Sequence, residues 1–547
     1  MGTVTDELGA SPTVQITTPT PTLITPSGAA GRAMLSWEGK HAPTPVAVPD
    51  ARLVEVVDPH AQLPLMWLMP KPTLPPVPSH EPGPNLLFYG DNQGVLAHLL
   101  AHGWRNQVKL IYIDPPFDSG GDYSRKVRLR HHEPHLLGET VQYRDTWSGD
   151  SYLQFIYERL FFLRDLLAED GCIWLHCDYR QAHRLRMLLE EVFGEENYLN
   201  TISWRSQVAR GAKVDAFFFP YSTQYLEVFA KNRAKPTVWY PQRRRLIFNR
   251  AEAASNYMED EGGFFRTSDP GTYSFSKLKE LHAEGRLYAP YSGEIVIDEA
   301  AQRITCSNGG NVGVKYYLTR LGRDRFAVDR AIDNLWEDIP GLGTTPGEDV
   351  GYPTQKTEAL LKRIINASTR PGDLVLDCFL GSGTSAAVAH KMGRRWIGCD
   401  FGYGAVQTAR RRLQRIVQET GPGFALYHME DATTPPSSEA GVATVHCTRV
   451  DAQTAQIEIV DYQAPPHPAR RRPRVHVAPD WRAMVDAVDI DPAYNGEVLR
   501  PVVMDLPRKR RVVVQGQYLV QVAETPAQIA VRVTDVFGQE HLVVQTV

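Results

Sequence analysis

Residues 110–123 read LIYIDPPFDSGGDY, and this stretch decides how the rest of the chain is interpreted. An apolar, β-favouring run stops at an acidic residue that two prolines follow. Because Pro115 and Pro116 have no backbone N–H to donate, the sequence predicts a strand that ends near Asp114. Ligands of open α/β folds bind at the carboxyl edge of the sheet. We therefore expect a carboxylate, two rigid carbonyls and the Phe117 ring at a ligand site.

This set of groups suits the exocyclic amino group of a nucleobase. The Asp114 carboxylate and the Pro115 carbonyl can accept both N–H bonds of such a group, and the fixed φ of proline holds the acceptors still. The nitrogen lone pair can then point at an electrophile while Phe117 stacks on a base that has left the duplex. Taken alone, Asp-Pro-Pro is explained equally well as a strand-ending turn without a catalytic role.

The composition is that of an ordinary globular chain, with 42% hydrophobic and 22% charged residues. Its 547 residues suffice for two to four domains. No apolar run approaches the roughly 18 residues that cross a bilayer, and the N-terminus lacks a secretory pattern. The six cysteines include no Cys-x-x-Cys pair, so we expect reduced thiols in a cytoplasmic protein, without a metal site.

A second motif, at residues 371–385, reads PGDLVLDCFLGSGTS and combines a strand, a glycine turn and a helix start. The next strand ends in Asp400, roughly twenty residues on, where a carboxylate can bind a ribose diol. A dinucleotide-binding turn would carry a third glycine. Asp377 suits an ammonium group rather than a pyrophosphate. S-adenosylmethionine, which has an α-amino group and a sulfonium, therefore fits this turn better than a dinucleotide.

Together the motifs resemble those of the β-class amino-group DNA methyltransferases, including the modification subunits of type III restriction systems. Residues 85–420 carry Asp-Pro-Pro-Phe first, a recognition-like segment next and Asp-x-Phe-x-Gly-x-Gly last, which is the β-class order. Residues 352–357, YPTQKT, look like the family's motif X, usually HPTQKP, from which Tyr352 and Thr357 depart.

The resemblance implies roles for individual residues. Asp114, Pro115, Pro116 and Phe117 are expected to hold the target amino group. Residues expected to bind S-adenosylmethionine are Asp91, Thr354, Lys356, Asp377, Phe379, Gly381, Ser382, Gly383 and Asp400. For Asp91, an ordinary helix N-cap is a close alternative. We interpret His176 and Asp178 as structural or pocket-lining residues.

The alternation of strands and helices predicts an α/β fold with a doubly wound, mostly parallel sheet, as in Rossmann-like methyltransferases. The predicted domains are a disordered Thr/Pro-rich N-terminus (1–32), an extension with a Pro-rich connector (33–84), a catalytic half (85–232), a target-recognition insertion (233–335), a cofactor-binding half (336–423) and a β-sandwich-like C-terminal domain (424–547).

Net charge is −4, so any nucleic-acid surface has to be local. The residues expected to contact DNA are Arg205, Arg210, Lys213, Arg243, Arg244 and Arg245. Each basic cluster, including 126–130 and 508–511, is, taken singly, more often a solvated face than a DNA contact. The aromatic residues of the insertion are likewise explained by a small core of its own.

The sequence therefore predicts a site-specific DNA methyltransferase that modifies adenine N6 within a restriction-modification or phage-defence system. Its expected partners are double-stranded DNA and defence-system subunits, with no membrane; a homodimer is left open. Two alternatives remain: cytosine N4 methylation, for which Ser-Pro-Pro is the commoner motif, and a catalytically silent DNA-binding subunit. The recognition sequence cannot be read from composition, because base contacts depend on geometry.

Overall fold

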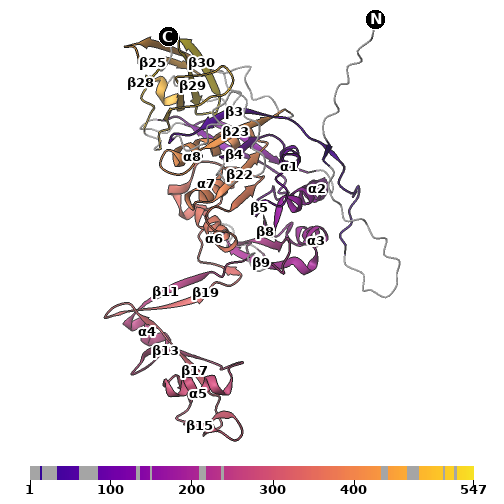
Figure 1. The fold of residues 1–547 in the computed structure, drawn as a ribbon, viewed down its shortest axis with the longest axis vertical. Coiled ribbons are helices and arrows are strands. Elements are labelled where there is room, and N and C mark those ends of the chain that lie inside the picture. The colour runs from indigo at the N-terminus through magenta and orange to yellow at the C-terminus, as the bar shows by residue number, and fades with distance from the viewer. Residues whose placement is uncertain are drawn as a thin grey trace. The chain divides into compact units, whose positions relative to one another are not determined.

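The computed structural model divides the chain into two units, residues 1–240 with 334–547, and residues 241–333. It describes residues 13–14, 34–60, 84–130, 136–147, 151–208, 217–235, 239–430, 432, 441–464, 480–508, 512–522 and 526–547. Figure 1 shows the course of the chain.

A ten-stranded sheet forms the centre of the larger unit. In spatial order its strands are β20 (Leu335–Trp336), β9 (Tyr198–Arg205), β10 (Thr223–Ala230), β8 (Leu167–Cys177), β5 (Val108–Ile113), β21 (Leu374–Asp377), β22 (Arg395–Asp400), β4 (Asn85–Tyr89), β23 (Phe424–Met429) and β3 (Ala51–Val57). From β8 to β23 all neighbours are parallel, whereas β10 and β3 are antiparallel to their partners. The predicted mostly parallel α/β sheet is confirmed.

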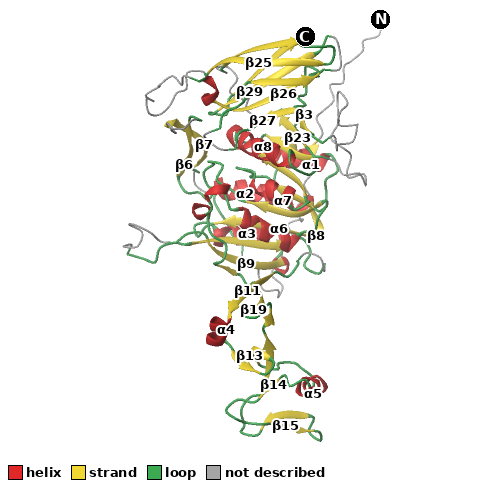
Figure 2. Ribbon diagram, turned by 90° about the vertical axis from the view of Figure 1, so that its left-hand side faces the viewer, coloured by secondary structure: helices red, strands yellow, loops and turns green. Residues whose placement is uncertain are grey.

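Helices cover both faces of this sheet, as a doubly wound fold requires (Figures 1 and 2). One layer contains α1 (Asn92–Ala101), α2 (Ser151–Leu166) and α3 (Ala182–Phe193), and the other contains α6 (Glu358–Ser368), α7 (Thr384–Lys391) and α8 (Tyr403–Val417). The β5 sequence VKLIYI is buried throughout, because a central parallel strand has helices on both sides. This burial places the chemistry at strand ends, where side chains reach solvent.

Several predicted boundaries differ from the structure because sheet pairing extends beyond the motifs. Strand β3 comes from the predicted N-terminal extension, and β23 comes from the start of the predicted C-terminal domain, yet both complete the main sheet. Within the predicted disordered segment, Thr13–Val14 forms β1 and pairs with β2 (Val46–Ala47). The rest of residues 1–32 and the Pro-rich connector at 61–83 lie outside the described residues.

Two further sheets form the C-terminal β-sandwich that the sequence predicts. One contains β24 (Val442–Arg449), β25 (Thr454–Gln463) and β28 (Gln517–Gln521), and the other contains β27 (Val503–Asp505), β26 (Val485–Asp491), β29 (Gln528–Asp535) and β30 (Glu540–Thr546). Alternating apolar residues from both sheets, such as Ile457 and Val531, share one buried cluster. The sandwich belongs to the larger unit and not to a unit of its own.

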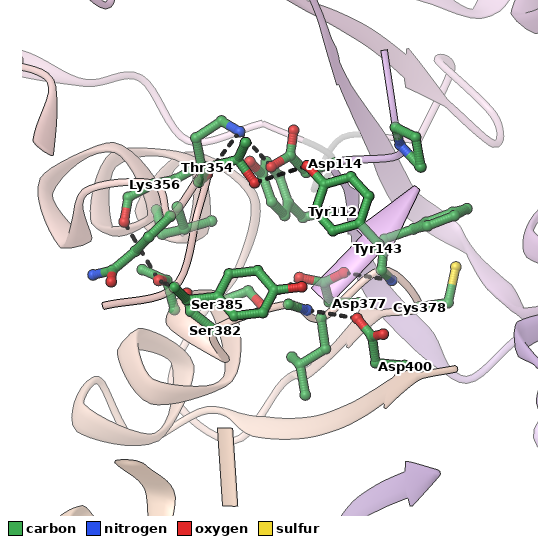
Figure 3. A pocket seen from close by; sticks show the side chains of 18 of the residues that line it. Tyr112, Asp114, Tyr143, Thr354, Lys356, Asp377, Cys378, Ser382, Ser385 and Asp400 are labelled. Carbon is green, nitrogen blue, oxygen red and sulfur yellow. Dashed lines mark hydrogen bonds and ion pairs between the residues drawn. The ribbon is translucent and has the colours of Figure 1, made fainter. Parts of the chain in front are cut away.

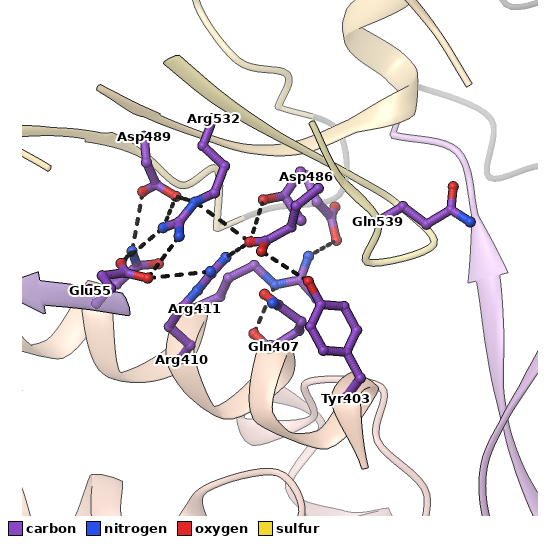
Figure 4. Close-up of polar contacts among 12 residues, drawn as sticks. Glu55, Tyr403, Gln407, Arg410, Arg411, Asp486, Asp489, Arg532 and Gln539 are labelled. Atoms are coloured by element: carbon purple, nitrogen blue, oxygen red, sulfur yellow. Dashed lines mark hydrogen bonds and ion pairs between the residues drawn. The ribbon is translucent and has the colours of Figure 1, made fainter. Parts of the chain in front are cut away.

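Buried ion pairs join the sandwich to the main sheet and to α8 (Figure 4). Arg532 of β29 lies 2.8 Å from Glu55 of β3 and 2.7 Å from Asp489 of β26. Arg410 of α8 lies 3.4 Å from Glu55, and both side chains are fully buried. Because removing one partner of a buried pair leaves the other charge uncompensated, these contacts fix the sandwich on the sheet.

The smaller unit corresponds closely to the insertion predicted at 233–335. It contains three small sheets, β11-β19-β18, β12-β13-β17-β14 and β15-β16, with bounds β11 (Arg243–Asn249), β12 (Met258–Asp260), β13 (Gly263–Ser268), β14 (Leu287–Tyr288), β15 (Ile295–Asp298), β16 (Arg303–Cys306), β17 (Gly313–Tyr317), β18 (Thr319–Arg320) and β19 (Arg325–Ala331). Its helices are α4 (Arg250–Asn256) and α5 (Phe275–Ala283). Phe264 and Phe326 pack in a local core, so some of its aromatic residues serve its own folding.

Candidate active site

Asp114 follows β5 directly and lies at the carboxyl edge of the parallel strands. Its Oδ2 atom forms an ion pair with the Lys356 ammonium group. Its Oδ1 atom is buried without a hydrogen-bond partner among the described residues. Burial raises the pKa of Asp114, and the charge of Lys356 opposes this rise. Because an unsatisfied buried acceptor is unfavourable, Oδ1 is placed to receive a hydrogen bond from a ligand.

Asp145 holds the turn that follows the two prolines. Its carboxylate accepts hydrogen bonds from the backbone amides of Phe117, Asp118 and Ser119, at 3.2, 2.9 and 2.8 Å. Asp145 is buried at the end of the hairpin formed by β6 (Gly121–Arg128) and β7 (Leu136–Asp145). One carboxylate thus fixes three consecutive amides, which sets the position of the Phe117 ring.

His176 packs behind this turn as a structural residue. It is fully buried, its Nε2 lies 2.8 Å from the Gln224 Oε1, and its Nδ1 lies 2.9 Å from the Tyr112 hydroxyl. The His176 ring lies 6.0 Å from that of Phe117. Burial and the nearby charge of Lys356 hold the pKa of His176 well below its ordinary value. The imidazole is therefore neutral at physiological pH and supports the Phe117 side chain by packing.

Asp377 ends β21, the strand next to β5 at the same sheet edge. Its Oδ1 accepts a hydrogen bond from the Phe379 amide at 3.0 Å, and its Oδ2 accepts one from the Ser385 hydroxyl at 2.5 Å. Burial, and to a smaller degree the charges of Asp114 and Asp400, raise the pKa of Asp377 to about 7. A buried carboxylate with so high a pKa is held charged only when a cation lies beside it.

The glycine turn joins Asp377 to α7 and contacts Asp400. The Gly381 amide donates to Asp400 Oδ2 at 2.8 Å, while the Gly402 amide donates to Oδ1 at 2.8 Å. Burial raises the pKa of Asp400 to about 6, and both amides lower it. Gly383 has φ +73°, and a Cβ there would lie 2.9 Å from the Ala409 side chain. Only glycine therefore lets α7 start this close to α8.

The segment that resembles motif X forms the opposite wall. Thr354 adopts a left-handed backbone with φ +61°, and its hydroxyl lies 3.1 Å from that of Tyr143. The Lys356 ammonium donates to the Thr354 carbonyl at 3.3 Å in addition to its ion pair with Asp114. Lys356 therefore contacts the Asp-Pro-Pro turn directly, a contact that the sequence did not predict.

These segments surround one cleft with about 690 Å³ of empty space (Figure 3). Asp114 and Pro116 line it from one segment, and Tyr143 lines it from β7. Residues 352 and 354–356, residues 377–382 with 384–385, and Asp400 with Phe401 also line it, whereas Gly383 does not. The cleft thus brings together the two motifs that lie more than 250 residues apart in the sequence and holds three carboxylates against one ammonium group. Pro115 and Phe117 lie in the same turn but do not line the cleft itself.

Asp91 does not line this cleft. Its carboxylate accepts a hydrogen bond from the Gln93 amide at 2.8 Å, as an N-cap of α1, and pairs with Arg159 at 3.1 Å. The N-cap alternative is therefore observed, and the structure gives no support to the cofactor role expected for Asp91. A Gly-Asp pair after a strand fits both roles, so the sequence could not separate them.

The residues expected to contact DNA do not form one described cluster. Arg205 ends β9 and pairs with Glu337 at 3.0 Å. Arg243, Arg244 and Arg245 are exposed on β11 of the smaller unit, where Arg245 forms a two-pronged pair with Asp329 at 2.7 and 2.8 Å. Arg210 and Lys213 lie outside the described residues.

Three residues at this site were missed by sequence reasoning. Tyr112 and Tyr143 line the cleft, and Asp145 fixes the turn. Tyr112 lies inside the apolar run that predicts β5. Only its position two residues before Asp114, on the same side of the strand, could have indicated that it faces the cleft. Tyr143 and Asp145 lie on a hairpin without a motif, and nothing in the pattern singles them out.

Two other kinds of site were sought in the described part of the chain. No group of three or more His, Cys, Asp or Glu side chains there could hold a metal ion. No helix among those residues is both long and apolar enough to span a membrane.

Comparison with known proteins places this geometry in context. Residues 108–411 match the family model N6_N4_Mtase, described as DNA methylase. The probable type III restriction-modification enzyme HindVI Mod subunit of Haemophilus influenzae is 26% identical over 407 residues, covering 63% of this chain and 52% of that protein. Type II methyltransferase M.EcaI of Enterobacter cloacae is 28% identical over 352 residues, which cover 60% of this chain and 69% of that protein.

A further relative has a higher sequence identity over a shorter segment. DNA adenine methyltransferase YhdJ of Escherichia coli is 49% identical over 80 residues, 15% of this chain and 27% of that protein. Among solved structures, the M1.HpyAVI–SAM complex is 16% identical and covers 60% of this chain and 98% of that one, with a TM-score of 0.32. The chain thus spans about half the length of the HindVI subunit.

Proposed function

The chain belongs to the N6/N4 DNA methylase family, and on this premise we propose that it transfers a methyl group from S-adenosylmethionine to adenine N6 in DNA. The match covers both the Asp-Pro-Pro-Phe turn and the glycine turn. The single observation that carries the proposal is the convergence of these two motifs on one cleft.

The cleft fits S-adenosylmethionine in charge. Asp114, Asp377 and Asp400 face one ammonium group, that of Lys356, so the lining has two net negative charges when all are ionised. The raised pKa values of Asp377, about 7, and Asp400, about 6, reflect carboxylates buried without a cation. A ligand with an ammonium and a sulfonium supplies the missing positive charge.

Individual residues suit separate parts of this cofactor. Asp377 would hold the α-ammonium group, and the Ser382 and Thr384 hydroxyls beside it would face the carboxylate. Asp400, fixed by the Gly381 and Gly402 amides, would bind the ribose hydroxyls. We propose that Lys356 and Thr354 lie beside the cofactor carboxylate and contact it less directly, because Lys356 is engaged with Asp114.

The Asp-Pro-Pro turn would hold the target base. The cofactor supplies an electrophilic methyl group. Asp114 Oδ1, buried and without a donor, would accept one N–H bond of the adenine amino group, and the Pro115 carbonyl would accept the other. Phe117, positioned by Asp145 and His176, would stack on the flipped base. Held in this way, the amino nitrogen would point its lone pair at the methyl group that the cofactor supplies, and Asp114 would accept the proton that the nitrogen loses and release it to solvent.

Adenine is favoured over cytosine by two observations. The acceptor residue is Asp114 and not the serine that is commoner in cytosine N4 enzymes. The 49% identical segment belongs to a protein named as a DNA adenine methyltransferase, although it covers only 15% of this chain. A role in restriction-modification is supported by the HindVI and M.EcaI likenesses, and we propose double-stranded DNA and a restriction subunit as partners.

Nucleoside analysis tests this proposal. The purified chain is incubated with unmethylated genomic DNA and S-adenosylmethionine that carries a deuterated methyl group, and the DNA is then digested for mass spectrometry. We expect deuterated N6-methyl-2′-deoxyadenosine and no deuterated N4-methyl-2′-deoxycytidine. Label only in cytosine would replace the adenine assignment, and no label in any nucleoside, with cofactor binding intact, would contradict the methyltransferase proposal.

A further inference from the structure

A second cleft, with about 1460 Å³ of empty space, lies along α8, between the β6–β7 hairpin, the loop at 347–351 and the C-terminal sandwich. Nine basic and five acidic side chains line it, an excess of four positive charges. The basic residues are Arg125, Lys126, Arg128, Arg130, Lys391, Arg411, Arg412, Arg415 and Arg508. Lys126, Arg128 and Arg130 thus share one site with Arg508, which is remote from them in sequence.

The deep end of this cleft concentrates guanidinium groups around one carboxylate. Asp486 accepts from Arg130 at 2.5 Å and from Arg411 at 2.8 Å, and Arg125 lies 3.7 Å away (Figure 4 labels Arg411 and Asp486). The three arginine side chains are only 10%, 6% and 14% exposed, respectively. Buried like charges crowded around one carboxylate repel one another, so a second anion at this point would be stabilised.

Three further cations border the same space without an acidic partner. Among the described residues, Lys126, Arg128 and Arg415 form no ion pair within 4.0 Å. Arg415 donates to the Pro507 carbonyl at 3.3 Å, while its Nε is buried without a partner. Burial and the charges of Arg130 and Arg508 lower the pKa of Arg415, although Asp486 opposes the change. An anion would satisfy both its charge and its unpaired N–H.

The other acidic side chains of the cleft are already engaged. Glu358 pairs with Lys391 at 2.7 Å and with Arg412 at 2.9 Å, and Glu419 pairs with Arg508. Glu348 and Asp349 accept hydrogen bonds from the backbone amides of Glu358 and Gly351, at 2.8 and 2.7 Å, and neither forms an ion pair among the described residues. The uncompensated charge therefore belongs to the Lys126, Arg128 and Arg415 side and to the crowded Asp486 centre.

We propose that this cleft binds a compact chain of phosphates, such as the di- or triphosphate of a nucleotide. Guanidinium groups match phosphate oxygens in geometry and charge, and several groups converging from different elements suit a ligand with more than one phosphate. A DNA duplex cannot enter a cavity of this volume to reach side chains that are 6% to 14% exposed. The site is separate from the Asp114–Asp377 cleft and goes beyond the methyl transfer proposed above.

Isothermal titration calorimetry of the full chain with inorganic tripolyphosphate tests the proposal, with ATP, orthophosphate and a short DNA duplex as further ligands. We expect saturable binding of one tripolyphosphate per chain and much weaker binding of orthophosphate. Equal affinity for ATP identifies the phosphate chain alone as the ligand, whereas tighter ATP binding adds a nucleoside contact.

The Lys126→Ala, Arg128→Ala double variant should weaken tripolyphosphate binding at least about tenfold, since each lost charge-assisted contact contributes about 1.5 kcal/mol. The matched control is Lys277→Ala, Lys279→Ala on α5 of the smaller unit, which removes the same charge and should bind as the wild type does. Lys126→Glu alone is a second test, because this exposed side chain has little influence on folding.

Two results would overturn the proposal: no saturable heat with tripolyphosphate or ATP at millimolar concentration, or unchanged affinity in a folded Lys126→Glu chain. Loss of duplex binding in the double variant without any tripolyphosphate binding would assign these side chains to nucleic acid instead. Methyl transfer is not measured, so these outcomes are independent of the proposed enzymatic function.

Discussion

The charge state of Asp377 should control cofactor affinity as a function of pH. The pKa of this buried carboxyl is raised to about 7 in the free protein. An ammonium group beside it binds the ionised form, so binding must include the free energy of ionising Asp377 at low pH. At pH 5, about two units below that pKa, roughly 1% of the carboxyl is ionised, and the penalty is about 2.7 kcal/mol. Affinity for S-adenosylmethionine should therefore rise about fiftyfold between pH 5 and pH 7.5, and fall again toward pH 9 as the ligand's own ammonium group, with a pKa of about 8, loses its proton.

Calorimetric titrations from pH 5 to pH 9 measure this change. The Asp377→Asn variant should bind weakly throughout and retain only the smaller dependence that comes from Asp400 and from the ligand's own amino group. The matched control is Asp373→Asn, which should behave as the wild type. It removes the same charge from a nearby turn, where the Asp373 carboxylate accepts a hydrogen bond from the Arg370 amide. A wild-type affinity that varies less than threefold, or an Asp377→Asn variant with the full dependence, would refute this reasoning.

The same residue should make the free protein's stability depend on pH. Because folding raises the pKa of Asp377 from 3.8 to about 7, its contribution to stability is fully present below pH 3.8 and is lost as pH rises toward 7. Relative to Asp377→Asn, the wild-type chain should lose up to ~4 kcal/mol of unfolding free energy between pH 4 and pH 8. Denaturant unfolding without cofactor measures the difference, and parallel curves for the two proteins would contradict the assigned pKa.

The remaining predictions concern the turn, its neighbours and the inserted unit. Lys356→Met removes the charge that lowers the pKa of Asp114, so methylation should fall at least about tenfold near pH 6 and recover near pH 9. The control Lys362→Met on α6 should have no effect, and a loss of activity that does not depend on pH would exclude this explanation. Asp145→Ala frees three amides of the Phe117 turn and should lower the methylation rate about a hundredfold with unchanged cofactor affinity, and a wild-type rate would show that the turn holds without it. The Arg243→Ala, Arg244→Ala double variant should reduce the slope of log DNA affinity against log salt concentration by about 1.8. Arg245→Ala should change this slope less, because Arg245 is paired with Asp329. Equal slopes for all variants would place the DNA contact elsewhere.

Strand ends and glycine turns could be predicted because local chemistry determines them. The prolines after Asp114 end β5 whatever surrounds them, and Ala182–Phe193 reads as an amphipathic helix and forms α3. Parallel strands then bring Asp114 and Asp377 to one edge, so the sequence order of the motifs was enough to predict their convergence.

Contacts made through tertiary structure could not be predicted. The Lys356–Asp114 ion pair and the Asp145 turn contacts depend on how a hairpin and a loop fold over the sheet edge, and no spacing in the sequence encodes this. The place of strand β3 in the main sheet was missed because its seven residues gain a partner only when β23 forms beside them. No sequence pattern indicated that Arg410 and Arg411 of α8 are buried against acidic residues of the sandwich, Glu540 and Asp486.

The most direct measurement of the central claim is the single-turnover methylation rate of Asp114→Asn alongside its affinity for S-adenosylmethionine. If Asp114 acts on the amino nitrogen while Asp377 and its neighbours hold the cofactor, the rate should fall at least about a thousandfold, within the range seen for preorganised electrostatic groups. The dissociation constant of the cofactor should stay within about threefold of the wild-type value. A variant that methylates DNA within tenfold of the wild-type rate would contradict the account.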